Sequence, residues 1–149
     1  MPSINHHIMT IARSSNLFRS ERLQGTGLCG PHCPYILRVC REPGTTQEAI
    51  ARALCVNKSS VARQLASLEQ SGFVERRPCP TDSRAMEVYP TQKAFDALPA
   101  VRAVLAEWNE RITDGFSDEE RALFAALAER AAANARAEIE RIRGGEADG

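Results

Sequence analysis

Residues 57–90 read NKSSVARQLASLEQSGFVERRPCPTDSRAMEVYP, and this stretch decides the fold of the chain. Its first half carries apolar residues at spacings of four and three, namely Val61, Leu65 and Leu68. Such spacing places them on one side of a helix and leaves polar residues on the other side. Asn57 can cap the first turn, and Gly72 can adopt the left-handed conformation that ends a helix. The sequence therefore predicts a helix with both ends marked.

The second half of the same stretch predicts a β-hairpin. Two short segments that favour strands, residues 73–77 and 85–89, flank the loop 78–84. The loop reads PCPTDSR and is rich in turn-forming residues. We therefore expect a wing of two strands directly after the helix.

A shorter helix is predicted just before this stretch. Thr45 and Glu48 have the spacing of a capping box, in which each side chain accepts a hydrogen bond from the backbone of the other residue. A turn at residues 54–56 then joins the two helices. Two short helices and a tight turn form a helix-turn-helix, whose second helix enters the DNA major groove. With the hairpin, the predicted unit is a winged helix-turn-helix.

This region resembles the MarR (multiple antibiotic resistance regulator) family of transcription factors. Asp82-Ser83-Arg84 matches the Asp-x-Arg signature of the family's wing, and the runs 60–63 and 68–76 match its helix and first strand. The resemblance implies a homodimer in which the first and last helices of two subunits pair. The two recognition helices would then lie about one DNA turn, roughly 34 Å, apart. It also implies a crevice that takes a small aromatic or phenolic effector.

The flanking sequence predicts helices on both sides of the winged unit. One covers residues 4–23, a second begins at Gly30-Pro31, and a long one follows residue 91 with a bend at Pro99. The expected fold class is mainly α with a small β-hairpin wing: a winged helix-turn-helix plus a helical dimerisation region.

Three regions divide the predicted architecture. Residues 31–90 form the winged helix-turn-helix DNA-binding domain. Residues 1–30 and 91–143 form the helical dimerisation region, and residues 144–149 form a disordered tail. A chain of 149 residues has room for about one domain.

The final predicted helix has a long apolar side. Ser117 and Glu120 form a second capping box, and about 26 residues of helix follow, which is about 39 Å. Its apolar residues are Leu123, Phe124, Leu127, Ala131, Ala135, Ile139 and Ile142. A small winged domain cannot cover a helix of this length, so the apolar side needs a partner. That partner is either a second subunit or, by sequence alone, an intramolecular bundle.

Charge is unevenly distributed along the chain although the net charge is zero. Lys and Arg outnumber Asp and Glu by 5 to 2 in residues 1–44 and by 7 to 5 in residues 45–93, whereas residues 94–149 carry 7 against 12. Phosphate contacts act locally, so a neutral protein with a basic face can bind DNA. No run of about 18 apolar residues and no leading signal core occurs, so we expect a cytoplasmic protein that binds no membrane.

Candidate DNA-binding residues lie on the predicted second helix, at the start of the helix before it and in the wing. They are Thr46, Gln47, Asn57, Lys58, Ser59, Ser60, Arg63, Gln64, Arg77, Thr81, Asp82, Ser83 and Arg84. Lysine and arginine suit guanine, and glutamine suits adenine. Arg84 is expected in the minor groove, with Asp82 ordering the loop. The alternatives are a solvated helix face, simple capping at Thr46, and an Asp82–Arg84 surface ion pair worth under about 1 kcal/mol.

The five cysteines suggest two kinds of sensor. Cys29 and Cys33 are candidates for thiol oxidation, and Cys29, His32 and Cys33, with the pair at residues 6 and 7, could ligate zinc. The plainer interpretation is that Cys33 and Cys40 are small buried hydrophobic residues and that the histidine pair is a solvated helix start. Cys55 and Cys79 lie in the helix-turn-helix turn and the wing loop, where modification would disturb DNA contact.

The predicted function is that of a sequence-specific transcriptional regulator, a repressor whose dimer binds palindromic operator DNA. Release would come from a small-molecule ligand or from thiol modification. The alternatives are a metal-responsive regulator and a winged-helix module that binds protein. Phosphate-binding glycine loops, G-x-S-x-G and H-E-x-x-H do not occur, so no enzyme activity and no cofactor are expected.

Overall fold

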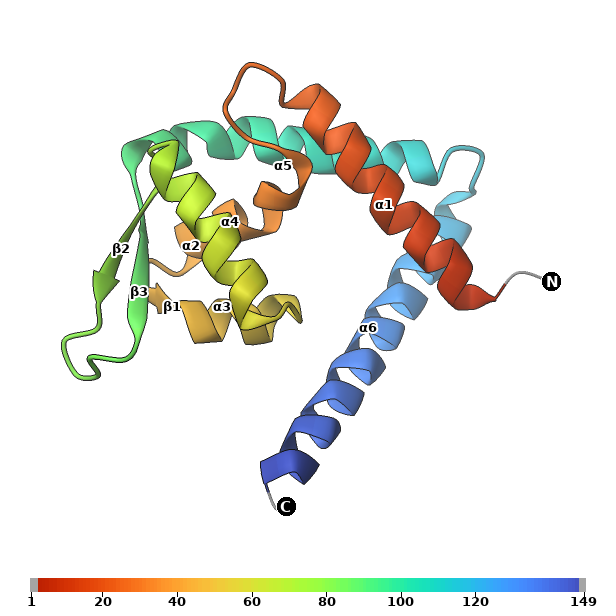
Figure 1. Cartoon of the computed structure of the whole chain (residues 1–149). Coiled ribbons are helices and arrows are strands. Elements are labelled where there is room, and N and C mark those ends of the chain that lie inside the picture. The colour runs from red at the N-terminus through yellow and green to blue at the C-terminus, as the bar shows by residue number, and fades with distance from the viewer. Residues whose placement is uncertain (1–2, 148–149) are drawn as a thin grey trace. The chain divides into compact units, whose positions relative to one another are not determined.

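The computed structural model describes residues 3–147. Its elements in chain order are α1 (Ile4–Arg22), the 3-10 helix η1 (Gly30–His32), α2 (Cys33–Arg41), β1 (Thr45–Thr46), α3 (Gln47–Leu54), α4 (Lys58–Gln70), β2 (Val74–Pro78), β3 (Met86–Pro90), α5 (Gln92–Ile112) and α6 (Asp118–Ala147). The described residues form two compact units, which divide between Ile112 and Thr113. The predicted class, mainly helical with a small sheet, is confirmed (Figure 1).

The sheet has three antiparallel strands in the order β1-β3-β2. The hairpin β2–β3 has the predicted position, with each strand one residue further along the chain than expected. The sequence did not predict β1, a strand of two residues that pairs Thr45 with Val88. This short strand ties the start of α3 to the wing.

The core of the first unit lies beneath α4. The apolar residues predicted for this helix, Val61, Leu65 and Leu68, are fully buried. They join a cluster that includes Ile36 of α2 and Ile50 of α3. α4 packs against α3 and β2, while α2 packs against β3 and α5 (Figure 1). Burial of one such leucine or valine stabilises the fold by about 1.5–3 kcal/mol, so α4 is held firmly in place.

The helix caps agree with the sequence at α4 and α6 but differ at α3. Asn57 caps α4, and Gly72 after that helix has a φ of +82°, as predicted. The expected capping box of Thr45 and Glu48 is wrong: Thr46 is the cap, and its hydroxyl accepts from the Ala49 N–H at 3.1 Å. Thr45 cannot cap α3 because its backbone is paired in β1.

The two long helices of the C-terminal half, α5 and α6, are each continuous. α5 runs from Gln92 to Ile112 as one helix, and Pro99 lies inside it without ending it. The disordered tail predicted for residues 144–149 is wrong for residues 144–147, which continue α6; residues 148 and 149 lie outside the described residues.

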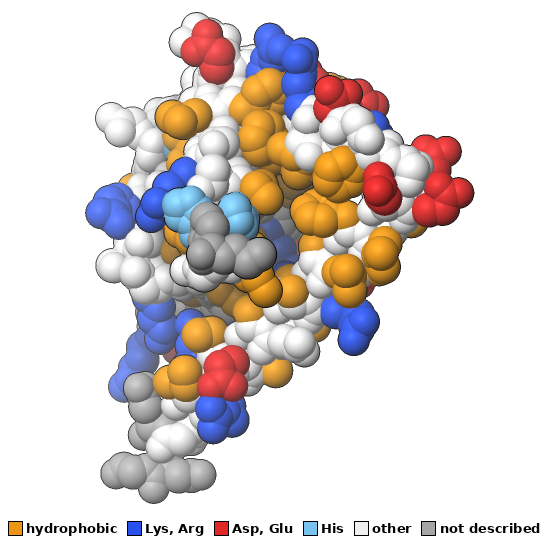
Figure 2. All heavy atoms as spheres, turned by 90° about the vertical axis from the view of Figure 1, so that its right-hand side faces the viewer, with side chains coloured by type: hydrophobic (Ala, Val, Ile, Leu, Met, Phe, Trp, Pro, Cys, Tyr) orange, Lys and Arg blue, Asp and Glu red, His pale blue; other side chains and the backbone are white. Residues whose placement is uncertain are grey.

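The second unit consists of a turn and α6, which is 30 residues or about 45 Å long. Its predicted capping box is present: Glu120 N–H donates to Ser117 Oγ at 3.1 Å, and Ser117 N–H donates to the Glu120 carboxylate at 2.9 Å. The large apolar side chains of α6 stay exposed, namely Leu123, Phe124, Leu127, Ile139 and Ile142. Exposed hydrophobic side chains are visible in the space-filling view (Figure 2).

None of the helices within residues 3–147 combines the length and the hydropathy that crossing a membrane requires.

Candidate nucleic-acid interface

α4 presents a polar face opposite its buried apolar side. Lys58, Ser59 and Arg63 are exposed on that face, while Ser60 and Gln64 are half-buried. Lysine, arginine and glutamine side chains at such positions can reach the edges of bases in a major groove. The structure therefore brings the five candidates of the predicted recognition helix to one surface.

The first turn of α4 is ordered by its own side chains. The Asn57 side-chain oxygen accepts from the Ser60 N–H at 2.8 Å and from the Ser59 hydroxyl at 2.8 Å. The Arg63 guanidinium donates to the Ser60 hydroxyl at 3.2 Å. Asn57 thus serves the cap, and the Arg63 side chain stays exposed one turn further along the helix.

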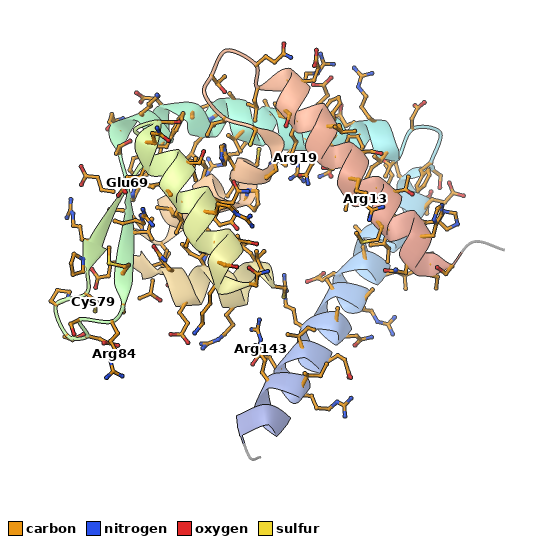
Figure 3. All side chains as sticks on the ribbon, viewed as in Figure 1. Arg13, Arg19, Glu69, Cys79, Arg84 and Arg143 are labelled. Carbon is orange, nitrogen blue, oxygen red and sulfur yellow. The ribbon has the colours of Figure 1, made fainter. Side chains whose placement is uncertain are left out.

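The wing loop is folded by Asp82 through the backbone. Its carboxylate accepts from the Arg84 N–H at 3.0 Å, its carbonyl accepts from the Ala85 N–H at 3.1 Å, and Ala85 in turn accepts from the Cys79 N–H at 2.9 Å. The alternative interpretation, a surface ion pair between the Asp82 and Arg84 side chains, is not found within residues 3–147. Arg84 lies at the tip of the wing with an exposed side chain (Figure 3).

The other wing candidates differ from one another. Thr81 and Ser83 are exposed in the loop beside Arg84. Arg77 is exposed too, but it forms an ion pair with Glu75 at 2.7 Å and lies over the Tyr89 ring at 4.5 Å from its centre. The hydrogen bond to Glu75 raises the pKa of Arg77 above its usual value. Arg77 is therefore restrained on the wing by contacts within the protein.

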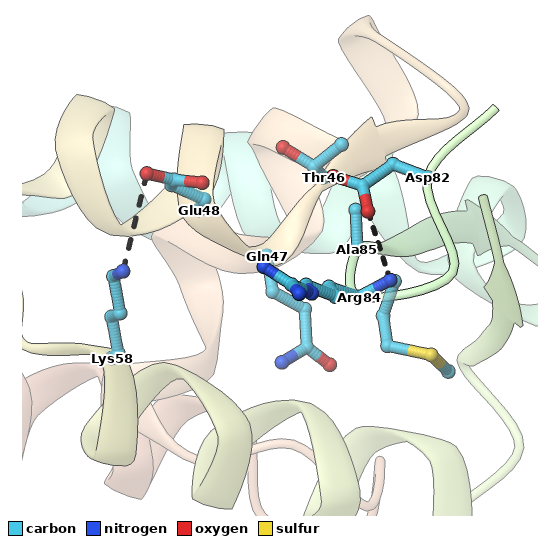
Figure 4. Close-up of a pocket in the computed structure, with 8 residues that line it drawn as sticks. Thr46, Gln47, Glu48, Lys58, Asp82, Arg84 and Ala85 are labelled. Carbon is cyan, nitrogen blue, oxygen red and sulfur yellow. Dashed lines mark hydrogen bonds and ion pairs between the residues drawn. The ribbon is translucent and has the colours of Figure 1, made fainter.

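A pocket connects the start of α3, the start of α4 and the wing (Figure 4). It has a volume of about 370 Å³ and is lined by Thr46, Gln47, Glu48, Lys58, Asp82, Arg84, Ala85 and Met86. The Lys58 ammonium is 3.9 Å from the Glu48 carboxylate. Five of the predicted candidates thus meet around one hollow, although they come from three separate segments of the chain.

Sequence reasoning missed the contacts of Arg76, which it quoted only as part of a motif. The Arg76 N–H donates to one oxygen of Glu69 at 2.8 Å, and its guanidinium donates to the other oxygen at 3.1 Å. These hydrogen bonds hold the pKa of Glu69 below its usual value. Arg76 also reaches Gln47 on α3. In the sequence, only the separation of seven residues between the acidic Glu69 and the basic Arg76 could have indicated this link.

The sensor candidates gather between α1 and α2, but they do not form a metal site. The Cys29 sulfur is 3.4 Å from His32 Nδ1, which also accepts from the Cys29 N–H at 3.1 Å. Cys33 is fully buried, and burial raises the pKa of its thiol. Within the described part of the chain, no three His, Cys, Asp or Glu side chains are placed to hold a metal ion. The metal-responsive alternative gains no support from this arrangement.

A capped helix with a polar face, a short helix before it and a hairpin with an arginine at its tip define a winged helix-turn-helix DNA-binding protein. A sequence profile of the MarR family matches residues 36–86. A crystal structure of MarR is 30% identical, covers 90% of this chain and 98% of its own, and superposes with a TM-score of 0.82. The chain belongs to the MarR family.

Two other similar proteins extend the comparison. The HTH-type transcriptional regulator YybA of Bacillus subtilis (strain 168) is 26% identical over 97% of both chains. A MarR family transcriptional regulator from Listeria monocytogenes, solved in complex with 26mer DNA, is 19% identical, with 97% of both chains covered and a TM-score of 0.85. This chain is accordingly a DNA-binding transcriptional regulator and not an enzyme.

Proposed function

We propose that this protein is a repressor whose homodimer binds palindromic operator DNA in the cytoplasm and leaves it when an effector binds. The observation that carries the proposal is the joint placement of Lys58 at the start of α4, Gln47 of α3 and the wing-tip Arg84 around one pocket. A helix in the major groove and an arginine in the adjacent minor groove together would read both the sequence and the shape of a half-site.

The individual roles follow from the chemistry of each side chain. Lys58, Arg63 and Gln64 are assigned to base edges, while Ser59 and Ser60 are assigned to phosphates near the start of α4. Thr46 is assigned to a phosphate at the N-terminus of α3, where the helix dipole favours an anion. Thr81, Ser83 and Arg84 are assigned to the backbone and minor groove beside the wing. Asp82 and Asn57 act by ordering the loop and the cap.

Dimerisation is supported by apolar surface that each unit leaves exposed. In the first unit, α1 exposes Ile4, Ile8 and Leu17. In the second unit, α6 exposes its apolar side over most of its length. Large contiguous apolar surfaces are characteristic of interfaces between subunits. A second copy of the chain is the proposed partner for both.

The effector site is proposed where α1 meets η1 and α5 in the first unit. Ser15 Oγ and Arg19 Nε lie one turn apart on α1, are buried, and have no hydrogen-bond partner within the described residues. Arg19 is close enough to Cys33 for its charge to lower the pKa of that thiol, against the larger effect of burial. A carboxylate or phenol oxygen would satisfy both α1 groups. The nearby pair Phe18 and Trp108, 5.3 Å between ring centres, suits an aromatic effector.

The DNA-binding roles are tested by comparing two arginine variants. Arg63→Ala should lose about 1–3 kcal/mol of binding free energy, mostly on operator DNA, because it is assigned to a base edge. Arg84→Ala should weaken binding to operator and unrelated duplex more evenly and lower the salt slope by about one unit. Arg102→Ala, which removes an exposed arginine from α5, is the matched control.

Each variant is titrated on operator and on random duplex at several salt concentrations. The control should bind as the unsubstituted protein does. Negligible losses for both Arg63→Ala and Arg84→Ala would refute the proposed interface. Equal losses on both duplexes for Arg63→Ala would instead remove its role in base recognition.

A further inference from the structure

We propose that Arg76 is the positioning residue of the DNA interface, and that it fixes Gln47 as a hydrogen-bond donor directed at DNA. The inference rests on the proposed function, because it assumes that the start of α3 faces DNA. It adds a residue that does not itself touch DNA, and it specifies which chemical group of Gln47 does.

Arg76 links three elements through one half-buried side chain. Its backbone N–H and its guanidinium donate to the two different oxygens of Glu69, at 2.8 and 3.1 Å, which joins β2 to the last turns of α4. Its other terminal nitrogen donates to the side-chain oxygen of Gln47 at 3.4 Å, which joins β2 to α3. The side chain of Arg76 is only 23% exposed, so these contacts are partly shielded from water.

The contact with Arg76 decides which end of the Gln47 amide is available. An arginine can only donate hydrogen bonds, so the amide oxygen of Gln47 must face it. The amide nitrogen, with its two donors, is then left for another partner. Gln47 also lines the pocket that contains Lys58 and Arg84, so its free donors lie on the same side as those two cations.

This orientation restricts what Gln47 can recognise. Two-point recognition of adenine needs the amide oxygen to accept from the base and the nitrogen to donate to it. Here the oxygen is turned toward Arg76, which takes one of its two acceptor positions, so the amide nitrogen is the end of Gln47 that is left to face DNA. The partners that fit are a phosphate oxygen or a base-edge acceptor such as guanine O6 or thymine O4. Gln47 should therefore prefer these acceptors to adenine at its position.

The experiment is a double-mutant cycle on DNA affinity, using Gln47→Ala, Arg76→Lys and the double variant. A lysine at 76 keeps the charge near Glu69 but lacks the planar fork that serves two acceptors at once. Each single variant should weaken operator binding about 5- to 100-fold. The double variant should bind operator no more weakly than whichever single variant has the lower affinity. Arg102→Lys, on an exposed arginine of α5, is the control for an arginine-to-lysine exchange in the same unit.

A second readout separates this role from a purely structural one. In the free protein, the side-chain amide of Gln47 should be ordered by NMR relaxation and should become mobile in Arg76→Lys, while the thermal midpoint stays close to that of the unsubstituted protein. Additive losses in the cycle, or a Gln47 amide that is equally ordered in both proteins, would overturn the inference. If the unsubstituted protein binds no duplex at all, the proposed function fails together with the DNA role of Gln47. If it binds and only the cycle is additive, this inference alone fails.

Discussion

The exposed apolar side of α6 gives the sharpest test of assembly. We expect the double substitution Leu127→Glu, Ile139→Glu to convert a dimer into a monomer. Both side chains lie on the face of α6 that remains exposed in the second unit, where they are 48% and 38% exposed. Burial against a second subunit would cover that area, whereas two carboxylates there would have to be desolvated or would keep the face open.

The expected loss of dimer affinity follows from the exposed fractions of the apolar side chains on α6. The five large apolar side chains of α6 are between 38% and 60% exposed. Covering about half of each side chain stabilises a complex by about 1 kcal/mol, so one subunit contributes about 5 kcal/mol and a symmetric dimer about 10 kcal/mol. Removing two of the five from each subunit loses about 4 kcal/mol, which is roughly a thousandfold increase in Kd even before the cost of the charges.

Sedimentation over a range of protein concentration measures this increase directly. Ala122→Glu, Ala133→Glu is the matched control: it adds the same two charges to α6, but helical spacing places them opposite the apolar side. Circular dichroism of each variant shows whether the helices remain folded. The control should sediment as the unsubstituted protein does, and the Leu127, Ile139 variant should sediment as a folded monomer or lose helix.

Two results would refute this reasoning. One is an unsubstituted protein that is monomeric at micromolar concentration. The other is a Leu127, Ile139 variant with the Kd of the control, since the apolar side of α6 would then not be buried in the dimer.

The remaining predictions concern capping, redox chemistry and pH. Asn57→Ala should lower the free energy of unfolding by about 1 kcal/mol, seen as a lower urea midpoint, because the side-chain cap of α4 is lost; an unchanged midpoint would contradict it. Peroxide should weaken DNA binding through the half-buried Cys29 rather than the buried Cys33, so Cys29→Ser should remove the effect and dithiothreitol should reverse it. Burial lowers the pKa of His32 from 6.5. As the pH falls through 6.5, the unfolded chain therefore binds a proton before the folded chain does, and the free energy of unfolding decreases. Urea titrations above and below that pH should show this decrease, and His32→Asn should reduce it.

The sequence by itself determined the winged helix-turn-helix, because local rules govern each of its parts. The spacing of Val61, Leu65 and Leu68 decides which side of α4 is buried, and a single residue at each end decides where the helix starts and stops. The loop residues between the two strands decide where the hairpin turns. Such signals lie within a few residues of the structure that they specify, so they can be read without knowing the rest of the fold.

Local rules failed where a distant segment competed for the same residue. Thr45 and Thr46 can both cap a helix, and the choice between them is made by Val88, which pairs with Thr45 and leaves Thr46 at the start of α3. A capping pattern cannot contain that information, because the strand lies about 40 residues further along the chain. The same applies to β1, which is too short to be recognised without its partner.

Only the tertiary structure decided how the candidate residues combine. The pocket beside the wing joins side chains from three segments, and Arg76 reaches Glu69 and Gln47 across seven and 29 positions. Composition and spacing mark Gln47 as polar, but they do not show that its amide oxygen is turned toward Arg76. Hydrogen bonds between distant side chains depend on where the core places their backbones, so the direction in which Gln47 can donate was fixed by packing and not by any pattern in the sequence.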